Sequence, residues 1–321
     1  MKRTCLLFLL IFTIFLSCKQ KKENLYTMGI FQVNDAPHLN FVREGFIKCL
    51  EDNGYVNGKN IRLILRNGKG SLPEVQRIAQ EFVSEKVDII VALSTPCLQA
   101  SIHATRGIPI VFSSVANPFL AGAGRSDNDH LRNVSGVSSK GPIKQSLVFI
   151  KEVMPNINRI GTLWTPSELN SEYYLSLAQE SASELGFEIK AIPIQNPNEV
   201  LLATQILINK NIDIIYQISD NTINACFEAL GQVAADNRIP LFGGFLISTK
   251  LGACAALGWD FFDMGYKAGR IALRVKNGES PADIPFEYME DVKLHLNLKN
   301  AEKQKVHFSE EILKRADEII Q

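Results

Sequence analysis

Small polar side chains recur where buried strands are expected to end, and their types suit a small charged ligand. They follow apolar runs in both halves of the chain: Gln32, Ser94, Thr95, Ser113, Ser114, Asn170, Ser171, Asp220 and Asn221. We expect Thr95 and Asn221 to open helices, whose free N–H groups can hold a carboxylate. Asp220 could hold an ammonium group. The set therefore favours a zwitterionic ligand, although each residue alone is equally well explained as a helix cap.

Three aromatic residues stand near the same strand ends. Trp164 ends an expected strand, Phe245 follows two glycines, and Trp259 follows the segment from Gly252 to Gly258. Such rings can line an apolar pocket, but large aromatic side chains belong more often to a core. Trp164 and Phe245 join the candidate ligand-binding residues.

Motifs for catalysis, metal binding and cofactor binding are missing from the sequence. The five histidines lack a metal-ligand spacing, and neither a GxSxG elbow nor a GxxxxGK[ST] phosphate loop occurs. Gly122-Ala123-Gly124 lacks the third glycine of a dinucleotide fingerprint. Asp88 and Asp213 each begin a strand, far from the polar strand ends, and are interpreted as structural. The sequence predicts no metal, no cofactor and no catalytic constellation.

The spacing of apolar residues predicts the scaffold for these polar groups. Short apolar runs typical of strands buried on both faces occur at 26–33, 61–65, 87–93 and 108–112, and again near 159–164, 188–194, 212–218 and 239–242. Helical spacing lies between them, with helices expected near 171–185, 198–209 and 221–236. Alternating strands and helices predict parallel sheets covered on both faces.

The two halves of the chain also resemble each other. Val87-Asp88-Ile89-Ile90 corresponds to Ile212-Asp213-Ile214-Ile215, and Ile108-Pro109-Ile110 to Ile239-Pro240-Leu241. These matches keep their order and lie about 130 residues apart. They predict two doubly wound α/β lobes, with a ligand at the carboxyl ends of the strands.

Charge and composition exclude several classes of protein. The 34 basic and 34 acidic residues give a formal net charge of zero, and the pI is about 7.0. A nucleic-acid partner therefore has no electrostatic support.

The first 24 residues are expected to lie outside the fold. Lys2 and Arg3 precede an apolar stretch typical of a secretory signal peptide. The ending Phe15-Leu16-Ser17-Cys18 fits the bacterial lipobox, which predicts removal of 1–17, a lipid on Cys18 and a tether over 18–24. An ordinary signal peptide with a coincidental cysteine is the alternative. Either reading places the mature protein in an extracytoplasmic compartment.

Longer runs give the chain a specific resemblance. They include Asp35-Ala36-Pro37-His38-Leu39, Gly54-Tyr55-Val56-Asn57-Gly58-Lys59-Asn60, Asn133-Val134-Ser135-Gly136-Val137, Asp220-Asn221-Thr222 and Gly258-Trp259-Asp260-Phe261-Phe262-Asp263-Met264-Gly265. Over nearly the whole mature chain, the sequence resembles ABC-transporter substrate-binding proteins of the tryptophan/tyrosine-binding lipoprotein type. It departs from them at Ser139, where members commonly have an acid, and at Trp164-Thr165-Pro166, where they often have Tyr-Asn-Pro.

The resemblance implies a type I periplasmic-binding-protein fold with three connections between two lobes. It places the first near 138–142, the return near 244–247 and the last strand pair near 286–297. The N-terminal lobe would comprise 25–139 plus 245–287, and the C-terminal lobe 140–244 plus 288–321. The resemblance also implies a protein that is not an enzyme. It would carry a small ligand, with an aromatic or hydrophobic amino acid as the leading hypothesis, to a membrane permease and its ATPase.

Two other functions stay open on the sequence. One is a ligand-sensing module that reports to a separate signalling partner. The other is a surface-attached enzyme, for which only Asp220 could serve as a general base.

Overall fold

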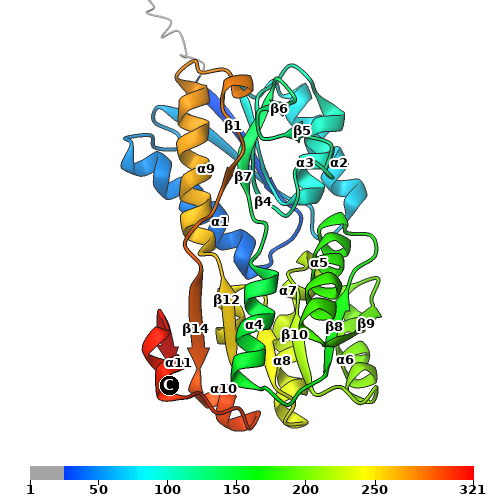
Figure 1. Cartoon of the computed structure of the whole chain (residues 1–321). Helices are drawn as coiled ribbons and strands as arrows, with labels where there is room; N and C mark the ends of the chain where they lie inside the picture. The colour runs from blue at the N-terminus through cyan, green and yellow to red at the C-terminus, as the bar shows by residue number, and fades with distance from the viewer. Residues whose placement is uncertain (1–24) are drawn as a thin grey trace, which may run out of the picture.

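Two sheets organise the chain, one in each half of the molecule, in the computed structural model of residues 25–321 (Figure 1). The signal peptide over 1–17, Cys18 and the tether over 18–24 lie outside the described residues. The prediction of a two-lobed α/β fold built on parallel strands is confirmed.

The first sheet has six parallel strands in the order β13-β7-β4-β3-β1-β2. Apolar residues fill both faces of its central strands because helices α1 and α9 cover one face and α2 and α3 the other. The strands are β1 (Tyr26–Gln32), β2 (Ile61–Asn67), β3 (Ile89–Leu93), β4 (Ile110–Val115), β7 (Val134–Ser138) and β13 (Glu287–Tyr288). The helices are α1 (Pro37–Asp52), α2 (Leu72–Ser84), α3 (Thr95–Ala104) and α9 (Phe261–Lys276), and a small hairpin is formed by β5 (Gly124–Ser126) and β6 (Asp129–His130).

Two glycines let α1 and α9 pack backbone against backbone. A Cβ atom on Gly45 would lie 2.0 Å from the carbonyl oxygen of Phe262, and one on Gly265 would lie 1.9 Å from that of Val42. Any larger residue at either position would therefore push the helices apart. This contact fixes α9, which comes from the last quarter of the chain, against the N-terminal helix α1.

The second sheet has seven strands in the order β15-β14-β12-β11-β10-β8-β9, of which only β12 and β14 pair antiparallel. Helices α4 and α5 cover one face, and α6 and α8 the other. The strands are β8 (Arg159–Trp164), β9 (Glu188–Pro193), β10 (Ile214–Gln217), β11 (Leu241–Gly243), β12 (Ala255–Gly258), β14 (Lys293–Asn297) and β15 (Glu318–Ile320). The helices are α4 (Ile143–Val153), α5 (Leu169–Leu185), α6 (Val200–Ile208), α7 (Asn221–Asn224), α8 (Phe227–Asp236), α10 (Leu298–Lys303) and α11 (Glu310–Arg315).

The helix expected near 221–236 is interrupted. The backbone of Cys226, with φ −132° and ψ 28°, leaves the helical region and separates α7 from α8. Single-turn 3₁₀ helices complete the fold at η1 (Pro197–Glu199) and η3 (Pro281–Asp283), and a longer one at η2 (Leu246–Leu251).

The chain passes between the sheets three times: between Ser138 and Ile143, between Gly258 and Phe261, and between Tyr288 and Lys293. The expected return near 244–247 is wrong, and with it the assignment of 245–258 to the N-terminal lobe. The reason is β12, which pairs with β11 and β14 in the second sheet. We therefore define the first lobe as 25–138 plus 261–288 and the second lobe as 143–258 plus 293–321.

Both lobes use an aspartate in the same structural way. Oδ2 of Asp88 accepts a hydrogen bond from the backbone N–H of Thr27, at 2.6 Å. Oδ2 of Asp213 likewise accepts from the N–H groups of Asn158 and Arg159, at 2.9 and 2.8 Å. These acids join neighbouring strands at their amino ends, in agreement with their interpretation as structural.

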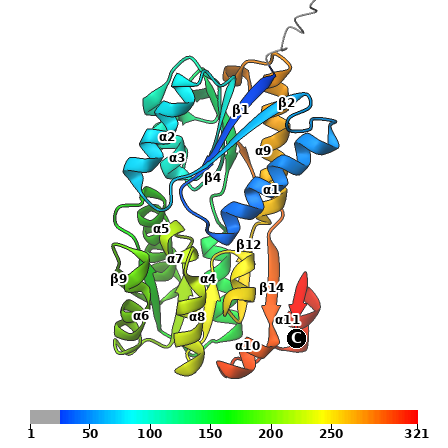
Figure 2. The same ribbon diagram turned by 180° about the vertical axis from the view of Figure 1, so that it is seen from behind.

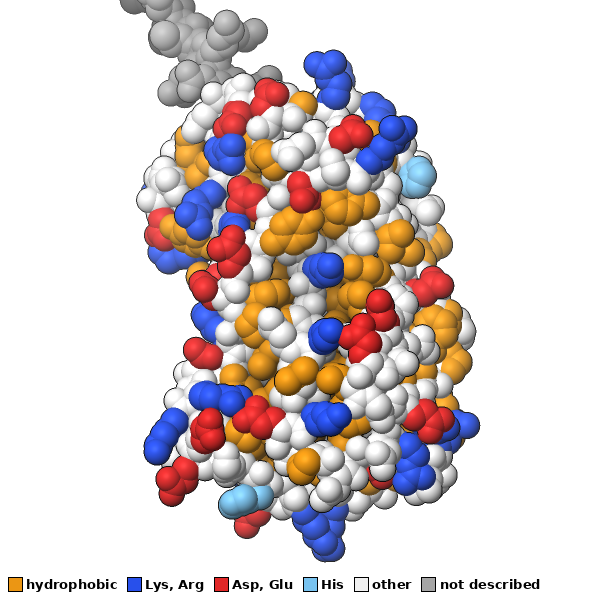
Figure 3. Space-filling model, in the orientation of Figure 1, with side chains coloured by type: hydrophobic (Ala, Val, Ile, Leu, Met, Phe, Trp, Pro, Cys, Tyr) orange, Lys and Arg blue, Asp and Glu red, His pale blue; other side chains and the backbone are white. Residues whose placement is uncertain are grey.

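On the face seen in Figure 3, acidic and basic side chains are interspersed over both lobes, and neither charge forms a continuous patch. From behind, the beginning of α1 approaches the second lobe beside β12 (Figure 2). The two lobes touch here and also where α3 meets α5.

Candidate ligand-binding site

The carboxyl ends of the strands in both sheets point toward the boundary between the lobes. This follows because β7 and β12 run parallel to their inner neighbours β4 and β11, and each leads directly into a connection to the other lobe. Nδ2 of Asn34 donates across the boundary to the carbonyl oxygen of Asn221, at 2.8 Å. The ring of His38 lies 5.7 Å from that of Phe245 in the second lobe. The lobes are thus in direct contact at their strand ends.

Three hydroxyl groups at the ends of β3 and β4 lie on the first-lobe side. Ser94, Thr95 and Ser113 are at most 1% exposed, and their side-chain oxygens have no hydrogen-bond partner among the described residues. An unsatisfied buried hydroxyl costs about 1–3 kcal/mol, so most have partners. These oxygens are therefore well suited to a polar ligand.

The backbone is strained at the same two strand ends. Ser94 has φ 139° and Ser114 has φ 56°, values that L-residues other than glycine rarely adopt. Such positions cost about 1–3 kcal/mol each and cluster at functional sites. Helix α3 begins directly after Ser94 without a side-chain cap, which leaves its first N–H groups for another acceptor.

Two buried carboxyl groups form the second-lobe side. Oδ2 of Asp220 accepts from the N–H of Thr165 at 2.9 Å, and Oδ1 accepts from that of Ile223 at 2.8 Å. Glu168 accepts from the N–H groups of Asn221 and Thr222, at 3.0 and 2.9 Å. Both acids therefore cap the beginning of α7 and hold it against the loop that follows β8.

Within residues 25–321, no basic side chain forms an ion pair with either of these carboxyl groups. Burial, followed by the nearby charge of Glu168, raises the pKa of Asp220 to about 7, and hydrogen bonds from Ser171, Ile223 and Thr165 only partly oppose these effects. Burial also lowers the pKa of His38 to about 4, so its ring is neutral at pH 7. The site thus has an excess of negative charge that an ammonium group would neutralise.

Eight of the predicted site residues lie at these facing walls. Asp220, Asn221, Asn170 and Ser171 share one network, in which Nδ2 of Asn170 donates to Glu168 at 3.0 Å and Oγ of Ser171 accepts from the N–H of Thr165 at 2.9 Å. Ser94 and Thr95 lie at the start of α3, which packs against α5 of the second lobe. Ser113 and Ser114 belong to the adjacent strand β4.

The other three predicted residues make contacts of a different kind. The amide of Gln32 is engaged within the first lobe, where Nε2 donates to Asn34 and Asn40 and Oε1 accepts from Arg43. Phe245 is fully buried between His38 and Phe227. Trp164 is half-buried and packs against the core beneath α4 and α5.

Sequence reasoning missed Glu168, Asn34 and His38 as individual site residues. Asn34 and Glu168 lie in the loops that follow β1 and β8, whereas His38 lies in the first turn of α1. Glu168 is the only acid between Thr165 and Ser171. An acid in such a loop was a signal that could have found it. The two interlobe contacts of Asn34 and His38 depend on how the lobes meet and have no local signature.

Within residues 25–321, no cluster of His, Cys, Asp and Glu has the arrangement of a metal site. No helix in the same range has the length and apolarity needed to cross a bilayer.

Two sheets joined by three connections, with polar strand ends meeting at the boundary, define a type I periplasmic binding protein. Residues 27–320 match the family of ABC transporter substrate binding proteins, and the chain belongs to this family. Proteins of this family act outside the cytoplasm, where they bind ligands for transport, and they are not enzymes.

Named relatives include amino-acid binders. The chain is 36% identical to a tyrosine-binding protein of Clostridioides difficile over 278 residues, which are 87% of this chain and 79% of the relative. Its structure is similar to an ABC domain from Streptococcus pneumonia in complex with L-Trp, with a TM-score of 0.85 and 25% identity, covering 91% of this chain and 100% of that one.

The arrangement of the lobes can be compared with an open relative. A ligand-free, open structure of a substrate-binding protein with adhesive properties from Clostridium difficile is 31% identical and covers 92% of this chain and 100% of that one, yet its TM-score is only 0.68. The L-Trp complex scores higher at lower identity. As a whole, this chain is therefore more similar in structure to the ligand-bound relative than to the open one.

Proposed function

We propose that the protein captures a free amino acid, preferably aromatic or hydrophobic, between its lobes and delivers it to a membrane permease coupled to an ATPase. The observation that carries this proposal is the pair of buried, unneutralised carboxyl groups of Asp220 and Glu168 at the lobe boundary. A lipid on Cys18 would keep the protein near its permease, because several acyl chains anchor stably where a single one does not.

In this proposal the two charged ends of the amino acid bind to different lobes. The ammonium group lies at Asp220 and Glu168, where it neutralises buried negative charge. The carboxylate lies at the start of α3, where it accepts from the hydroxyls of Ser94 and Thr95 and from free N–H groups of the helix. Gln32, Ser113, Ser114, Trp164, Asn170, Ser171, Asn221 and Phe245 are proposed to complete the site around the rest of the ligand.

Capture and closure are one process in this mechanism. A ligand favours the closed arrangement of the lobes over the open one only because it makes more contacts in the closed arrangement, where it touches both lobes. The contact between Asn34 and Asn221, together with the packing of His38 on Phe245, would form as the lobes meet. The tyrosine-binding and tryptophan-bound relatives support an aromatic side chain on the ligand.

A thermal-shift screen of purified protein, refolded to remove copurified ligand, tests this function. The panel holds the twenty amino acids, small peptides, sugars and nucleosides. A ligand at a hundred times its Kd should add about 2.7 kcal/mol of stability. We expect selective stabilisation by Tyr, Trp or Phe. A response to sugars or nucleosides alone would refute the proposed ligand, and a panel without any response would refute solute capture itself.

A further inference from the structure

The two acids of the candidate site share the beginning of a single helix. Glu168 accepts from the backbone N–H groups of Asn221 and Thr222. Asp220 accepts from that of Ile223, the next residue of α7. Asp220 and Glu168 are only 0% and 5% exposed. Three consecutive N–H groups are thus divided between two buried carboxyl groups, which places these groups next to each other and away from solvent.

Hydrogen-bond donors are shared unequally between the two acids. Glu168 accepts five hydrogen bonds of 2.6 to 3.0 Å, from the backbone N–H and the side chain of both Asn221 and Thr222 and from the side chain of Asn170. Asp220 accepts two, both from backbone N–H groups. Hydrogen bonds donated to a carboxylate favour its ionised form. Of the two acids, Glu168 is therefore the better place for a negative charge.

Asp220 is the better place for a proton. Burial, and then the charge of Glu168, raise its pKa to about 7. The hydroxyl oxygen of Thr165 is buried beside Oδ2 of Asp220, which accepts from the N–H of the same threonine, and this hydroxyl lacks a partner in hydrogen-bond geometry among the described residues. A protonated carboxyl group is a donor that such an oxygen can accept from. Below neutral pH the ligand-free site therefore holds a negative charge on Glu168 and a proton on Asp220.

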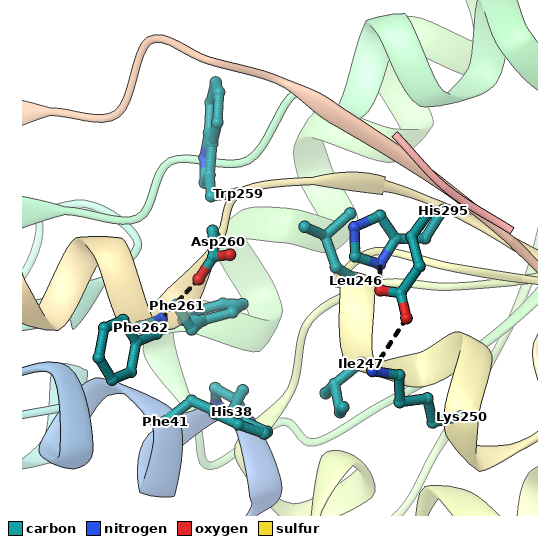
Figure 4. Close-up of a pocket in the computed structure, with 11 residues that line it drawn as sticks. His38, Phe41, Leu246, Ile247, Lys250, Trp259, Asp260, Phe261, Phe262 and His295 are labelled. Carbon is teal, nitrogen blue, oxygen red and sulfur yellow. Dashed lines mark hydrogen bonds and ion pairs between the residues drawn. The ribbon is translucent and has the colours of Figure 1, made fainter. Parts of the chain in front are cut away.

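Two other titratable side chains lie in the elements packed around Asp220, and both keep one charge state near neutral pH. Burial lowers the pKa of His38 to about 4, and this ring lies against that of Phe261, with 5.1 Å between the ring centroids (Figure 4). Burial raises the pKa of Cys226 to about 11, with a smaller contribution from the charge of Asp220. Both are therefore neutral between about pH 5.5 and 8. Amides and hydroxyls contribute the other polar groups, those of Asn34, Asn170, Ser171 and Thr222.

We propose that the ammonium group of the ligand displaces the proton of Asp220, so that capture of one amino acid releases one proton and weakens below neutral pH. This inference rests on the proposed function. The ammonium group keeps its own proton, and Asp220 gives its proton to the solvent. One positive charge thus takes the place of another, and the buried pair is never left with two uncompensated negative charges. An acidic medium therefore favours release of the ligand.

Calorimetric titration of ligand-free protein with L-tyrosine tests this link, in two buffers that differ in their enthalpy of ionisation. The difference between the two observed heats gives the number of protons released. With a pKa of about 7 for Asp220, we expect release of about 0.9 proton per tyrosine at pH 6 and about 0.1 at pH 8. The Kd should rise about ninefold from pH 6 to pH 5, and change less than about twofold between pH 7.5 and 8.5.

The outcomes separate this inference from the proposed function. Binding of L-tyrosine without proton release would overturn the inference alone. Release of a full proton at pH 8 as well as at pH 6 would mean that the ammonium group loses its own proton, and would overturn it too. Failure of L-tyrosine, L-tryptophan and L-phenylalanine to bind at every pH would contradict the proposed function and this inference with it.

Matched variants assign the proton. Asp220→Asn keeps an oxygen that can cap α7 but has no proton to release, so its weaker binding should not vary between about pH 5.5 and 8. Glu168→Gln removes a charge that raises the pKa of Asp220, so the rise in Kd should begin at lower pH. A merely structural role of Glu168 would instead weaken binding equally at every pH. Glu172→Gln, at an exposed acid in the first turn of α5, should keep the wild-type profile. Unchanged pH dependence in Asp220→Asn would overturn the inference.

A last measurement needs no ligand. The side-chain carboxyl signal of Asp220 in ¹³C spectra of ligand-free protein, assigned by its loss in Asp220→Asn, should shift with a midpoint near pH 7. Saturating L-tyrosine should hold this signal at its ionised position down to about pH 6, because the bound ammonium group favours the charged carboxylate. An Asp220 signal that stays ionised from pH 5 to 8 without ligand would overturn the inference, whether or not an amino acid binds.

Discussion

Replacing Asp220 by Asn should separate ligand binding from folding. Asp220 is completely buried, and its carboxyl group is proposed to hold the ammonium group of the ligand. Breaking a buried ion pair by removing one partner costs about 3–5 kcal/mol. Because Glu168 remains beside the ammonium group, we expect the lower end of that range. The Kd for the amino acid should rise roughly a hundredfold.

The same substitution has two effects on stability. It removes one of the two oxygens that accept from the N–H groups of Thr165 and Ile223, a loss that does not vary with pH, and it abolishes an ionisation whose effect does vary. In the ligand-free protein the pKa of Asp220 is raised to about 7 from an ordinary value of 3.8. The folded state therefore keeps its proton to higher pH than the unfolded chain does. Between these two pKa values the carboxyl group is ionised in the unfolded chain but protonated in the folded state. The free energy of unfolding therefore falls by about 1.4 kcal/mol for each pH unit in this range, and it falls no further above the higher pKa. Asn cannot ionise, so the variant should gain stability over the wild type as pH rises from about 4 to about 7.

Two assays on ligand-free protein check these effects. Calorimetric titration with L-tyrosine gives the change in Kd, and urea unfolding at several pH values gives the stability difference. Asp236→Asn, an exposed acid of α8 in the same lobe, is the matched control and should change neither quantity. Unchanged affinity in Asp220→Asn would remove this residue from the site. A stability difference that does not vary with pH would refute the raised pKa.

Three further perturbations have defined outcomes. Ser94→Ala removes a hydroxyl that has no partner among the described residues, so the free energy of unfolding should change by less than about 1 kcal/mol. L-tyrosine should bind about tenfold more weakly, and an equal loss of stability and affinity would contradict this expectation. Gly45→Ala should destabilise the protein by about 3 kcal/mol in urea unfolding because its Cβ would meet the backbone of α9, whereas Gly107→Ala, with open space around it, should be neutral. Cys18→Ala should release the protein from the membrane fraction of cells, and an unchanged membrane fraction would exclude the lipid anchor.

Much of the fold follows from local sequence signals. Strand β3 is a continuous apolar run, β10 begins with Ile214 and Ile215, and the helices between the strands have regular apolar spacing, so their order predicted the two α/β lobes. The return connection was misplaced because β12 is only four residues long and follows the small-residue segment Gly252-Ala253-Cys254. Its membership in the second sheet depends on pairing with β14, nearly forty residues later in the chain, which no local pattern reports.

The candidate site was predictable where it depends on strand ends and not where it depends on the meeting of the lobes. Ser94, Thr95 and Asp220 lie within three residues of a strand end, so their position was evident from the chain order. Glu168 supports Asn221 from another loop, 53 residues away, and Asn34 reaches the same residue across 187 residues. Those partners are fixed by tertiary packing, which spacing in the sequence does not encode.

In the proposed binding mode, both charged ends of a free amino acid are held at the lobe boundary. The most direct measurement is a calorimetric titration of ligand-free protein with L-tyrosine, tyramine, which lacks the carboxylate, and N-acetyl-L-tyrosine, which lacks the ammonium group. We expect one L-tyrosine per chain, and at least about thirtyfold weaker binding of each analogue, since each loses a charge-assisted contact worth about 2 kcal/mol or more. Equal binding of all three, or no binding of L-tyrosine, L-tryptophan or L-phenylalanine, would contradict this binding mode.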